Sequence, residues 1–326
     1  MMPMNVFKIF IWVGLLFSIH LLHAANPAQV TRTWPQRPVT LIVPFGVGGA
    51  TDQFARLLAP QLSSVIGQPV IIDNVAGAGG AIGIRKLLDM RPDGHVLLLG
   101  GISETILIPL NNHSIGYKPL DLQAVSITGS TPLVIVKRHN FPAKNLSDMV
   151  NLAHLSPMKY TYGSSGPGSY GHLMFEKFAQ KHGIQLLHVP YKGSSQMMTD
   201  MASGQIDAAL TSLPSALPYI KSGLVELLGV STPQRLTDWP QLPTFFDSDF
   251  AQEPVSLWGG VFVPRGLRKE VAQKINAAFD KTLMDANLRA NLTQLGILVE
   301  KNRSPSESQT YYERQIRQYQ YLANTP

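Results

Sequence analysis

Short apolar runs alternate along this chain with longer segments in which apolar residues recur at helical spacing. The runs at 38–44, 69–73 and 95–101 are rich in valine, isoleucine and leucine, and they predict buried strands. Between them, the segment 51–59 and the segment that ends at 88 place apolar residues along one helical face. Glycine-rich stretches join the first two strands to the helices that follow them. This order predicts a mostly parallel sheet with helices on both faces.

A second series of the same kind follows Thr131-Pro132. It predicts strands at 133–136, 160–163, 186–190, 206–210 and 225–230, and helices at 148–155, 172–182 and 195–203. A loop-like segment at 239–254 then leads to a strand at 257–264 and to two long helical stretches, 269–295 and 304–321. Because the two series share only this alternation of strand and helix, the pattern predicts two α/β domains.

The first residues have the pattern of an export signal. Residues 6–22 are almost entirely apolar, Lys8 supplies one positive charge, and Ala24 and Ala25 offer small residues for cleavage. The apolar stretch is short for a membrane span, so we expect residues 1–25 to be a cleaved signal peptide, with an uncleaved membrane anchor as the alternative. Export of a chain without cysteine fits a periplasmic location.

Composition excludes several kinds of protein. The chain has 326 residues, of which 44% are hydrophobic and 15% charged, and it has no cysteine. It therefore differs from disordered chains, and it has no disulfide, Cys-ligated metal site or thiol nucleophile. The formal net charge of +6 comes from scattered Lys and Arg residues. Because nucleic-acid binding needs a dense basic stripe or a known module, we expect no nucleic-acid partner, whereas a mild surplus favours small anions.

No catalytic or cofactor motif is complete in this sequence. Gly46–Gly49 lacks the Gly-Lys-Ser/Thr ending of a phosphate-binding loop, and Gly77–Gly83 has the wrong glycine spacing for a dinucleotide fingerprint. Gly163–Pro167 has proline where a nucleophile elbow has glycine. The seven histidines beyond the leader show no metal-site spacing, although a site assembled from distant residues stays open. We therefore expect no cofactor, no metal and no enzyme activity.

Three glycine-rich loops, at 45–50, 77–81 and 163–169, each lie between a predicted strand end and a predicted helix start. Helix N-termini expose unpaired backbone N–H groups and a partial positive charge, which suits a carboxylate. Ligands of open α/β sheets bind at the carboxyl ends of the strands, where all three loops are expected. The three loops together favour an anion-binding cleft, and ordinary tight turns are the alternative.

A set of motifs runs in order along the whole mature chain. The first half carries VTLIVPFGVGGATD at 39–52, GQPV at 67–70, GAGG at 77–80 and PDGH at 92–95. The second half carries YGSSGPGSYGHL at 162–173, HVPYKG at 188–193, GQID at 204–207 and LPSALP at 213–218. In this order and spacing the chain resembles the solute-binding receptors of tripartite tricarboxylate transporters, the Bug/TctC family.

The resemblance implies a type II periplasmic-binding-protein fold, also called a Venus flytrap, with two α/β domains and a ligand cleft between them. Domain 1 would be discontinuous, 36–131 plus 255–326, and domain 2 would cover 132–254. The implied function is a periplasmic receptor that closes on a small carboxylate and delivers it to the membrane permease subunits of the transporter. We expect the receptor to be a monomer.

The resemblance also places ligand contacts on the glycine loops and close to Ser103 and Asp207. The expected contacts are Phe45, Gly46, Gly48, Gly49, Ala50, Thr51, Asp52, Gly77, Ala78, Gly79, Gly80 and Ser103 in the first domain, and Ser164, Ser165, Gly166, Gly168, Ser169 and Asp207 in the second. Asp52 fits a carboxylate at a helix start better than a ligand contact, whereas Asp207 fits a ligand contact and a structural group at a strand end equally well.

Glu104 departs from the family pattern, which more often has a neutral residue there. If Glu104 faces the cleft, it would repel a dianion and favour a ligand with an amino or other cationic group. Two other functions stay open at this point. One is a ligand-sensing co-receptor for a membrane signalling protein. The other is a periplasmic enzyme acting on a carboxylate, which the missing nucleophile–base motif disfavours.

Overall fold

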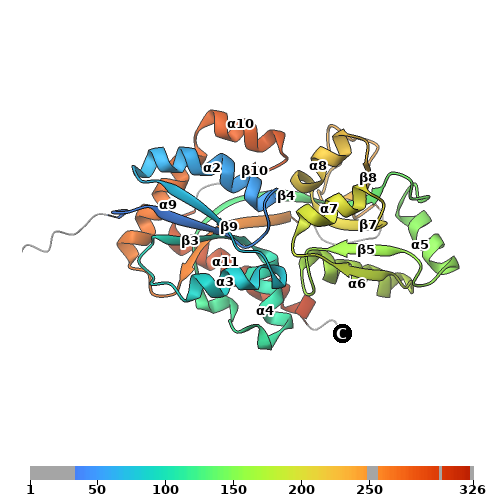
Figure 1. Ribbon diagram of the computed structural model, residues 1–326, viewed down its shortest axis with the longest axis horizontal. Helices are drawn as coiled ribbons and strands as arrows, with labels where there is room; N and C mark the ends of the chain where they lie inside the picture. Colours follow the sequence, from blue (N-terminus) through green and yellow to red (C-terminus); the bar gives the residue numbers. More distant parts are fainter. Residues whose placement is uncertain (1–33, 248–255, 301–302, 324–326) are drawn as a thin grey trace, which may run out of the picture.

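The chain folds into two lobes that share one long strand, as Figure 1 shows. The computed structural model describes residues 34–247, 256–300 and 303–323. The expected signal peptide at 1–25 and the expected domain boundary at 254–255 lie outside the described residues. None of the helices in the described ranges is long and apolar enough to cross a membrane.

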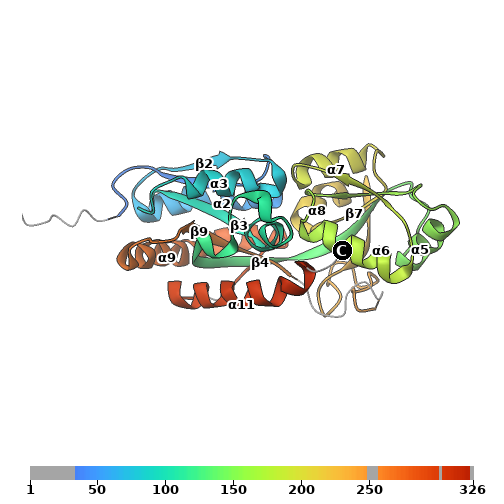
Figure 2. The ribbon, with the colours of Figure 1, turned by 90° about the horizontal axis from the view of Figure 1, so that it is seen from below.

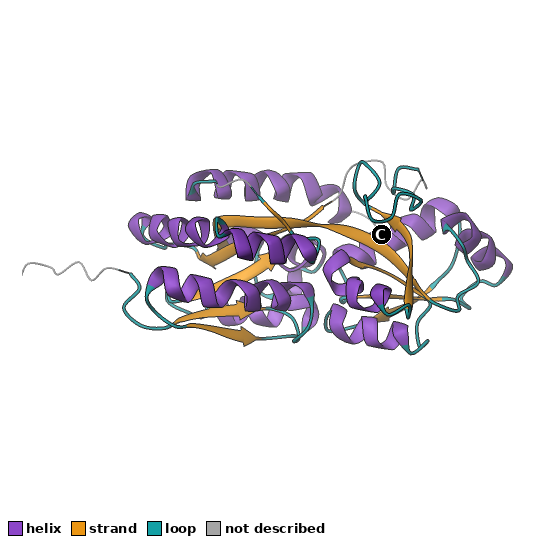
Figure 3. Cartoon of the chain, turned by 90° about the horizontal axis from the view of Figure 1, so that it is seen from above, coloured by secondary structure: helices purple, strands orange, loops and turns teal. Residues whose placement is uncertain are grey.

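The first lobe is built on a sheet with the strand order β2-β1-β3-β9-β4, and β10 also pairs with β4. Its strands are β1 (Val39–Val43), β2 (Val70–Asn74), β3 (Val96–Gly101), β4 (Leu122–Arg138), β9 (Ser256–Pro264) and β10 (Leu298–Val299). Its helices are α2 (Ala50–Ile66), α3 (Ala81–Leu88), α4 (Ile108–Asn111), α9 (Lys269–Leu283), α10 (Ala286–Gln294) and α11 (Pro305–Ala323). Helices cover both faces of the sheet (Figure 3).

The second lobe continues the sheet with the order β4-β7-β5-β6, and β8 also pairs with β4. Its strands are β5 (Thr161–Ser164), β6 (Leu187–Pro190), β7 (Ala208–Ser212) and β8 (Val225–Val230). Its helices are α5 (Leu146–Leu155), α6 (Tyr170–His182), α7 (Ser194–Ala202) and α8 (Leu213–Lys221). Apart from the strand predicted at 133–136, the predicted strands and helices of this half are confirmed to within a few residues at their ends, and α8 is an addition to them.

The shared strand β4 corrects two sequence predictions. Residues 122–132 pair with β9, and residues 133–138 pair with β7 and β8, so the short strand predicted at 133–136 is half of a strand that crosses both lobes. Polar residues and glycine at 126–131 hide its first half from a search for apolar runs. Pro132 lies at the last pair with β9, where a missing N–H is tolerated.

The direction of the central strands is the second correction. Strands β1, β2 and β3 are parallel, as are β5, β6 and β7, but β9 runs antiparallel to β3 and β4, and β4 antiparallel to β7 and β8. The prediction of a mostly parallel sheet is therefore wrong at the centre of the molecule. The strand–loop–helix order indicates only the parallel units at its two outer parts.

The C-terminal helices pack against the first lobe and hold the segment that follows β3. The stretch predicted as one helix at 269–295 is two helices, because Asp285 caps α10 by accepting a hydrogen bond from Leu288 N at 2.8 Å. Helix α11 lies along the lower face of the first lobe in Figure 2. Its buried Tyr312 hydroxyl donates to the carbonyl oxygens of Thr105 (2.9 Å) and Pro119 (3.1 Å). This contact anchors the segment that follows β3.

Candidate functional site

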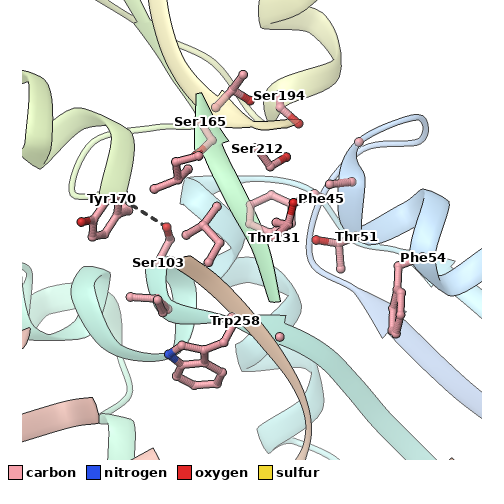
Figure 4. A pocket seen from close by; sticks show the side chains of 18 of the residues that line it. Phe45, Thr51, Phe54, Ser103, Thr131, Ser165, Tyr170, Ser194, Ser212 and Trp258 are labelled. Atoms are coloured by element: carbon pink, nitrogen blue, oxygen red, sulfur yellow. Dashed lines mark hydrogen bonds between the residues drawn. The ribbon is translucent and has the colours of Figure 1, made fainter. Parts of the chain in front are cut away.

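A cavity of about 180 Å³ lies between the two lobes, and Figure 4 shows the side chains that line it. Its wall collects residues from the carboxyl ends of four strands: Phe45 after β1, Ser103 after β3, Ser165 after β5 and Ser212 at the end of β7. The middle of β4, including Thr131, also lines the cavity. The cavity therefore lies where the topology of an open α/β sheet places ligands.

The first glycine loop contributes the start of helix α2 to the wall. Gly49, Ala50 and Thr51 line the cavity, and the N-cap Gly49 offers no side chain to cap the helix. The first N–H groups of α2 are therefore left without the side-chain partner that usually satisfies them. In Figure 4 the Thr51 side chain points toward the cavity.

Asp52 holds this loop in shape and does not line the cavity. Its side chain is 1% exposed, and its Oδ2 accepts hydrogen bonds from Gly48 N (2.8 Å) and Arg56 Nε (2.9 Å), while Oδ1 accepts one from Asn74 Nδ2 (3.0 Å). Burial alone would raise the pKa of Asp52, but these hydrogen bonds and the charge of Arg56 hold it below its ordinary value. The contacts thus give Asp52 the helix-start role that the sequence also allowed.

The second glycine loop lies at the contact between the lobes and not in the cavity wall. None of Gly77, Ala78, Gly79 and Gly80 lines the cavity. Gly79 meets the second lobe, because a Cβ on Gly166 would lie 3.3 Å from the Gly79 Cα. Gly166 also has a φ of +128°, which side-chain-bearing residues rarely adopt. Two glycines therefore let the backbones of the two lobes approach directly.

The loop of the second lobe, residues 164–169, lies only partly in the cavity wall. Ser165 lines the cavity, whereas Ser164, Gly166, Gly168 and Ser169 do not. Ser169 caps α6 by accepting from His172 N at 3.5 Å. One residue further, Tyr170 N donates to Ser103 Oγ at 3.1 Å and joins the lobes across the cavity (Figure 4).

A cluster of aromatic and titratable side chains supports this loop from below. The Ser164 hydroxyl lies 2.7 Å from His188 Nε2, and Gly168 N donates to His172 Nδ1 at 3.2 Å. The two imidazole rings are 4.3 Å apart. Burial, and then the charge of a protonated His172, lower the pKa of His188 to about 4, while Glu176 acts in the opposite sense. Both histidines are therefore neutral near pH 7, as hydrogen-bond acceptance by His172 Nδ1 requires.

Asp207 lies away from the cavity. Its Oδ1 forms an ion pair with Arg138 Nε at 2.8 Å, and its Oδ2 accepts from Thr161 N at 2.8 Å. Asp207 precedes β7, whereas Ser212 at the opposite end of this strand lines the cavity. Of the two roles expected for Asp207, these contacts are those of the structural one.

Six of the expected contact residues thus come together in the wall: Phe45, Gly49, Ala50, Thr51, Ser103 and Ser165. Gly46, Gly48 and the other expected residues do not line it. That any of them contacts a ligand stays a prediction.

Other wall residues were missed. Ser194 and Ser212 begin helices after strands, which is the same signal that identified the glycine loops. Trp258 and Thr131 come from the central antiparallel strands, which gave no such signal. The paired glycines Gly259 and Gly260, next to Trp258 within β9, were the available hint of a close approach.

The cavity offers hydroxyl groups and helix N-termini instead of basic side chains. Nine of the residues in its wall are serines or threonines: Thr51, Ser103, Thr128, Ser130, Thr131, Ser165, Ser194, Thr211 and Ser212. Within the described part of the chain, the wall contains no lysine, arginine or histidine. Helices α2, α7 and α8 all begin at the wall, and none has a side-chain hydrogen bond at its N-cap. Such an arrangement solvates an anionic group with neutral donors.

The serine hydroxyls of the second lobe are linked into a chain. Ser215 Oγ lies 2.9 Å from both Ser194 Oγ and Ser212 Oγ, so the starts of α7 and α8 are connected. Hydroxyls can turn to donate or accept, so this side of the wall adapts to the charge placed against it. The described residues contain no cluster of three or more His, Asp or Glu side chains suited to a metal ion.

Comparison with known proteins identifies relatives that match most of the chain. The family model for the receptor of the tripartite tricarboxylate transporter family (TctC) matches residues 54–320. Protein BugT of Bordetella pertussis is 32% identical over 282 residues, which cover 86% of each chain. MatC of Rhodopseudomonas palustris, solved with bound malate, superposes with a TM-score of 0.84 at 26% identity and covers 89% of this chain and 100% of its own. Rpa4515 of R. palustris, solved with adipate, superposes with a TM-score of 0.83 at 30% identity. The match covers 89% of this chain and 97% of the Rpa4515 chain.

Proposed function

Because the chain belongs to the receptor family of tripartite tricarboxylate transporters, we propose that it captures a small organic carboxylate in the cavity between its lobes. Receptors of this family are periplasmic solute-binding proteins with two lobes, and the present fold is of that kind.

The hydrogen-bond donors in the cavity wall are the main support for carboxylate binding. A carboxylate removed from water is stable only if hydrogen bonds replace its hydration. The start of α2 with Thr51 supplies donors from the first lobe, and Ser165 and Ser194 supply them from the second. Since neither lobe alone surrounds the cavity, the ligand would favour the arrangement in which the lobes are together.

Two structural relatives support a carboxylate as the ligand class. MatC was solved with malate and Rpa4515 with adipate, which are dicarboxylates of different length. We propose that Phe45, Gly49, Ala50, Thr51, Ser103 and Ser165 contact the ligand here, and that the loops at 77–80 and 166–168 act in closure. We also propose that the lobes turn about the strand β4 near residues 131–132, where β4 changes partners.

Delivery to the membrane subunits of a tripartite tricarboxylate transporter completes the proposed function. The receptor would be exported by its signal peptide, act in the periplasm as a monomer and release its ligand unchanged. The serine and threonine hydroxyls and the helix N-termini in the cavity wall support binding of a ligand that is released unaltered. Co-purification with the permease subunits tests delivery, and capture of a membrane sensor kinase instead would contradict it.

A thermal-shift screen of mono-, di- and tricarboxylates with the purified exported protein tests the binding function. A carboxylate at about a hundred times its Kd should add about 2.7 kcal/mol to the free energy of unfolding, which raises the Tm by several degrees. In Thr51→Val the ligand loses one hydroxyl partner, and we expect a five- to tenfold weaker Kd. Thr310→Val, on the exposed face of α11, is the matched control and should bind like the wild type. Absence of stabilisation by every carboxylate would overturn the proposal.

A further inference from the structure

The cavity wall contains a buried carboxyl group, that of Glu104. Glu104 belongs to a π-helical turn, η2 (Ser103–Leu107), which directly follows β3, and it is 2% exposed. Its Oε1 accepts a hydrogen bond from Gly101 N at 2.6 Å, and Gly100 and Gly101 also line the cavity. The carboxylate is therefore placed at the end of β3, in the wall itself.

The side chain of Glu104 is held in this position by its neighbours. A Cβ on Gly80 would lie 2.8 Å from the Glu104 Cβ, and a Cβ on Gly100 would lie 3.1 Å from its Oε1. The Tyr117 hydroxyl also donates to the backbone oxygen of Glu104 at 2.6 Å. The side chain of Glu104 is thus packed between the second glycine loop and the end of β3.

No cation balances this carboxyl group within the described chain. Glu104 takes part in none of the ion pairs there, and the cavity wall has no lysine, arginine or histidine. The negative charge of Glu104 acts on the phenols of Tyr117 and Tyr312, whose pKa values are raised first by burial, so that both phenols are neutral. Arg85 lies near Tyr117 and is not paired with Glu104.

We infer that Glu104 selects ligands that carry an ammonium group as well as a carboxylate, an inference that rests on the proposed carboxylate-binding function. A dicarboxylate would bring two negative charges into a small cavity that already holds a carboxyl group and has no cation. An amino acid places its ammonium against Glu104 and its carboxylate against the helix N-termini, so that both charges are satisfied. Glu104 is thereby a specificity-determining residue of this receptor.

The protonation of Glu104 is coupled to this selection. Burial raises its pKa to about 7 in the ligand-free protein, against hydrogen bonds from its own backbone N–H and from Gly101 that lower it. An ammonium group at contact distance would stabilise the ionised form and lower this pKa. Binding of an amino acid should therefore release protons near pH 7 and weaken as the solution becomes acidic.

Titration calorimetry with two matched pairs of probes tests the inference. The pairs are L-aspartate with succinate and L-glutamate with glutarate, which differ only in the ammonium group. At pH 8 we expect the wild type to bind the better amino acid, meaning whichever of L-aspartate and L-glutamate binds more tightly, at least tenfold more tightly than the dicarboxylate paired with it. Glu104→Gln keeps the shape of the side chain and removes its charge. In this variant the affinity for the amino acid should fall at least tenfold, and the affinity for the matching dicarboxylate should rise. The exposed Glu270→Gln on α9 should keep the wild-type ratio.

The pH dependence of amino-acid binding is a second measurement on the unaltered protein. The wild type should bind the better amino acid at least tenfold more weakly at pH 5 than at pH 8, and a properly folded Glu104→Gln should lose most of this dependence. His172 and His188 titrate in both proteins, so the difference isolates Glu104.

Three results would overturn the inference. One is a wild type that prefers the dicarboxylates, and another is an unchanged ratio in Glu104→Gln while carboxylates still bind. In both, the proposed binding function stands and the selection by Glu104 falls. If no carboxylate binds the wild type at all, the proposed function and the inference fall together.

Discussion

At the first glycine loop, three hydrogen bonds from Gly48, Arg56 and Asn74 converge on the carboxylate of Asp52. Asn74 also donates to the backbone oxygen of Phe45 at 3.1 Å, so the end of β2, the loop and the start of α2 form one network. The network aims the first N–H groups of α2 at the cavity. A residue that lies outside the wall can therefore determine how well the wall binds.

Asp52→Asn should weaken both folding and binding. The amide accepts fewer hydrogen bonds and lacks the charge that pairs with Arg56, so we expect a loss of about 1–3 kcal/mol in the free energy of unfolding. Carboxylate affinity should fall several-fold because the loop is no longer fixed. Urea unfolding and calorimetry measure the two effects. Asp89→Asn, exposed at the end of α3, is the control, and equal behaviour of the two variants would contradict the role of Asp52.

The histidines beneath the second-lobe loop give a pH prediction. His188 has a pKa of about 4 in the folded protein against 6.5 in the unfolded chain, and that of His172 is also lowered by burial. Between these values the unfolded chain binds more protons, so this pair makes stability rise as the pH increases from about 4 to 6.5. Glu176 and Tyr162 face the pair and are present in every variant compared.

The test compares the pH slope of stability in two variants. Because His188 is partly exposed and solvent screens its charge, we expect it to contribute about 1 kcal/mol between pH 5 and pH 7. His188→Gln should reduce this slope relative to the wild type, whatever its overall stability. The exposed His154→Gln should leave the slope unchanged. Glu104 titrates with the opposite sign and is common to all three proteins. An unaltered slope in His188→Gln would contradict the neutral state of this ring.

Among the elements, the two glycine loops that meet across the lobes matter as a pair. Gly79 and Gly166 bring their backbones together, and Gly168 packs close to Ile108 of α4. This contact is outside the cavity, so we expect it to affect binding through closure of the lobes. A side chain at Gly166 would require the facing backbone to give way by a few tenths of an ångström.

Gly166→Ala should weaken carboxylate binding at least tenfold. Its new Cβ would lie 3.3 Å from Gly79, and its φ of +128° adds backbone strain. Gly204→Ala has a positive φ of +82° but meets nothing within 4 Å, so it reports the strain without the contact. Titration calorimetry measures the affinity of both variants, and we expect Gly204→Ala to bind the carboxylate like the wild type. Equal affinities in the two variants would count against closure through this contact.

Elements with a clear local signal could be predicted from the sequence. Helix α2 and strands β1 and β3 have regular apolar patterns, and structure and prediction agree to within a few residues, although α2 runs on to Ile66. The first half of β4 could not be predicted, because it contains Ser, Thr and Gly residues and so lacks the apolar run that indicates a buried strand. These residues are buried only because β4 packs at the centre of the folded molecule. The break at Asp285 was missed because the apolar spacing continues across it.

At the scale of the whole molecule, the cavity exists only because segments far apart in sequence meet. The resemblance to the receptor family placed Thr51 and Ser165 among the expected contacts, whereas Thr131 and Trp258 depend on the antiparallel packing of β4 against β9. From the sequence it could not be decided whether Glu104 faces the cavity, because its position in the wall depends on the π-helical turn after β3. Loop chemistry was therefore predictable, and the central wall of the cavity was not.

A crystal structure of the exported protein with its most stabilising carboxylate would show directly whether the cavity is the binding site. We expect one ligand between the lobes, with its carboxylate within hydrogen-bond distance of the α2 start and of Ser165 or Ser194. A ligand bound outside this cavity, or an empty cavity in a protein saturated with ligand, would contradict it.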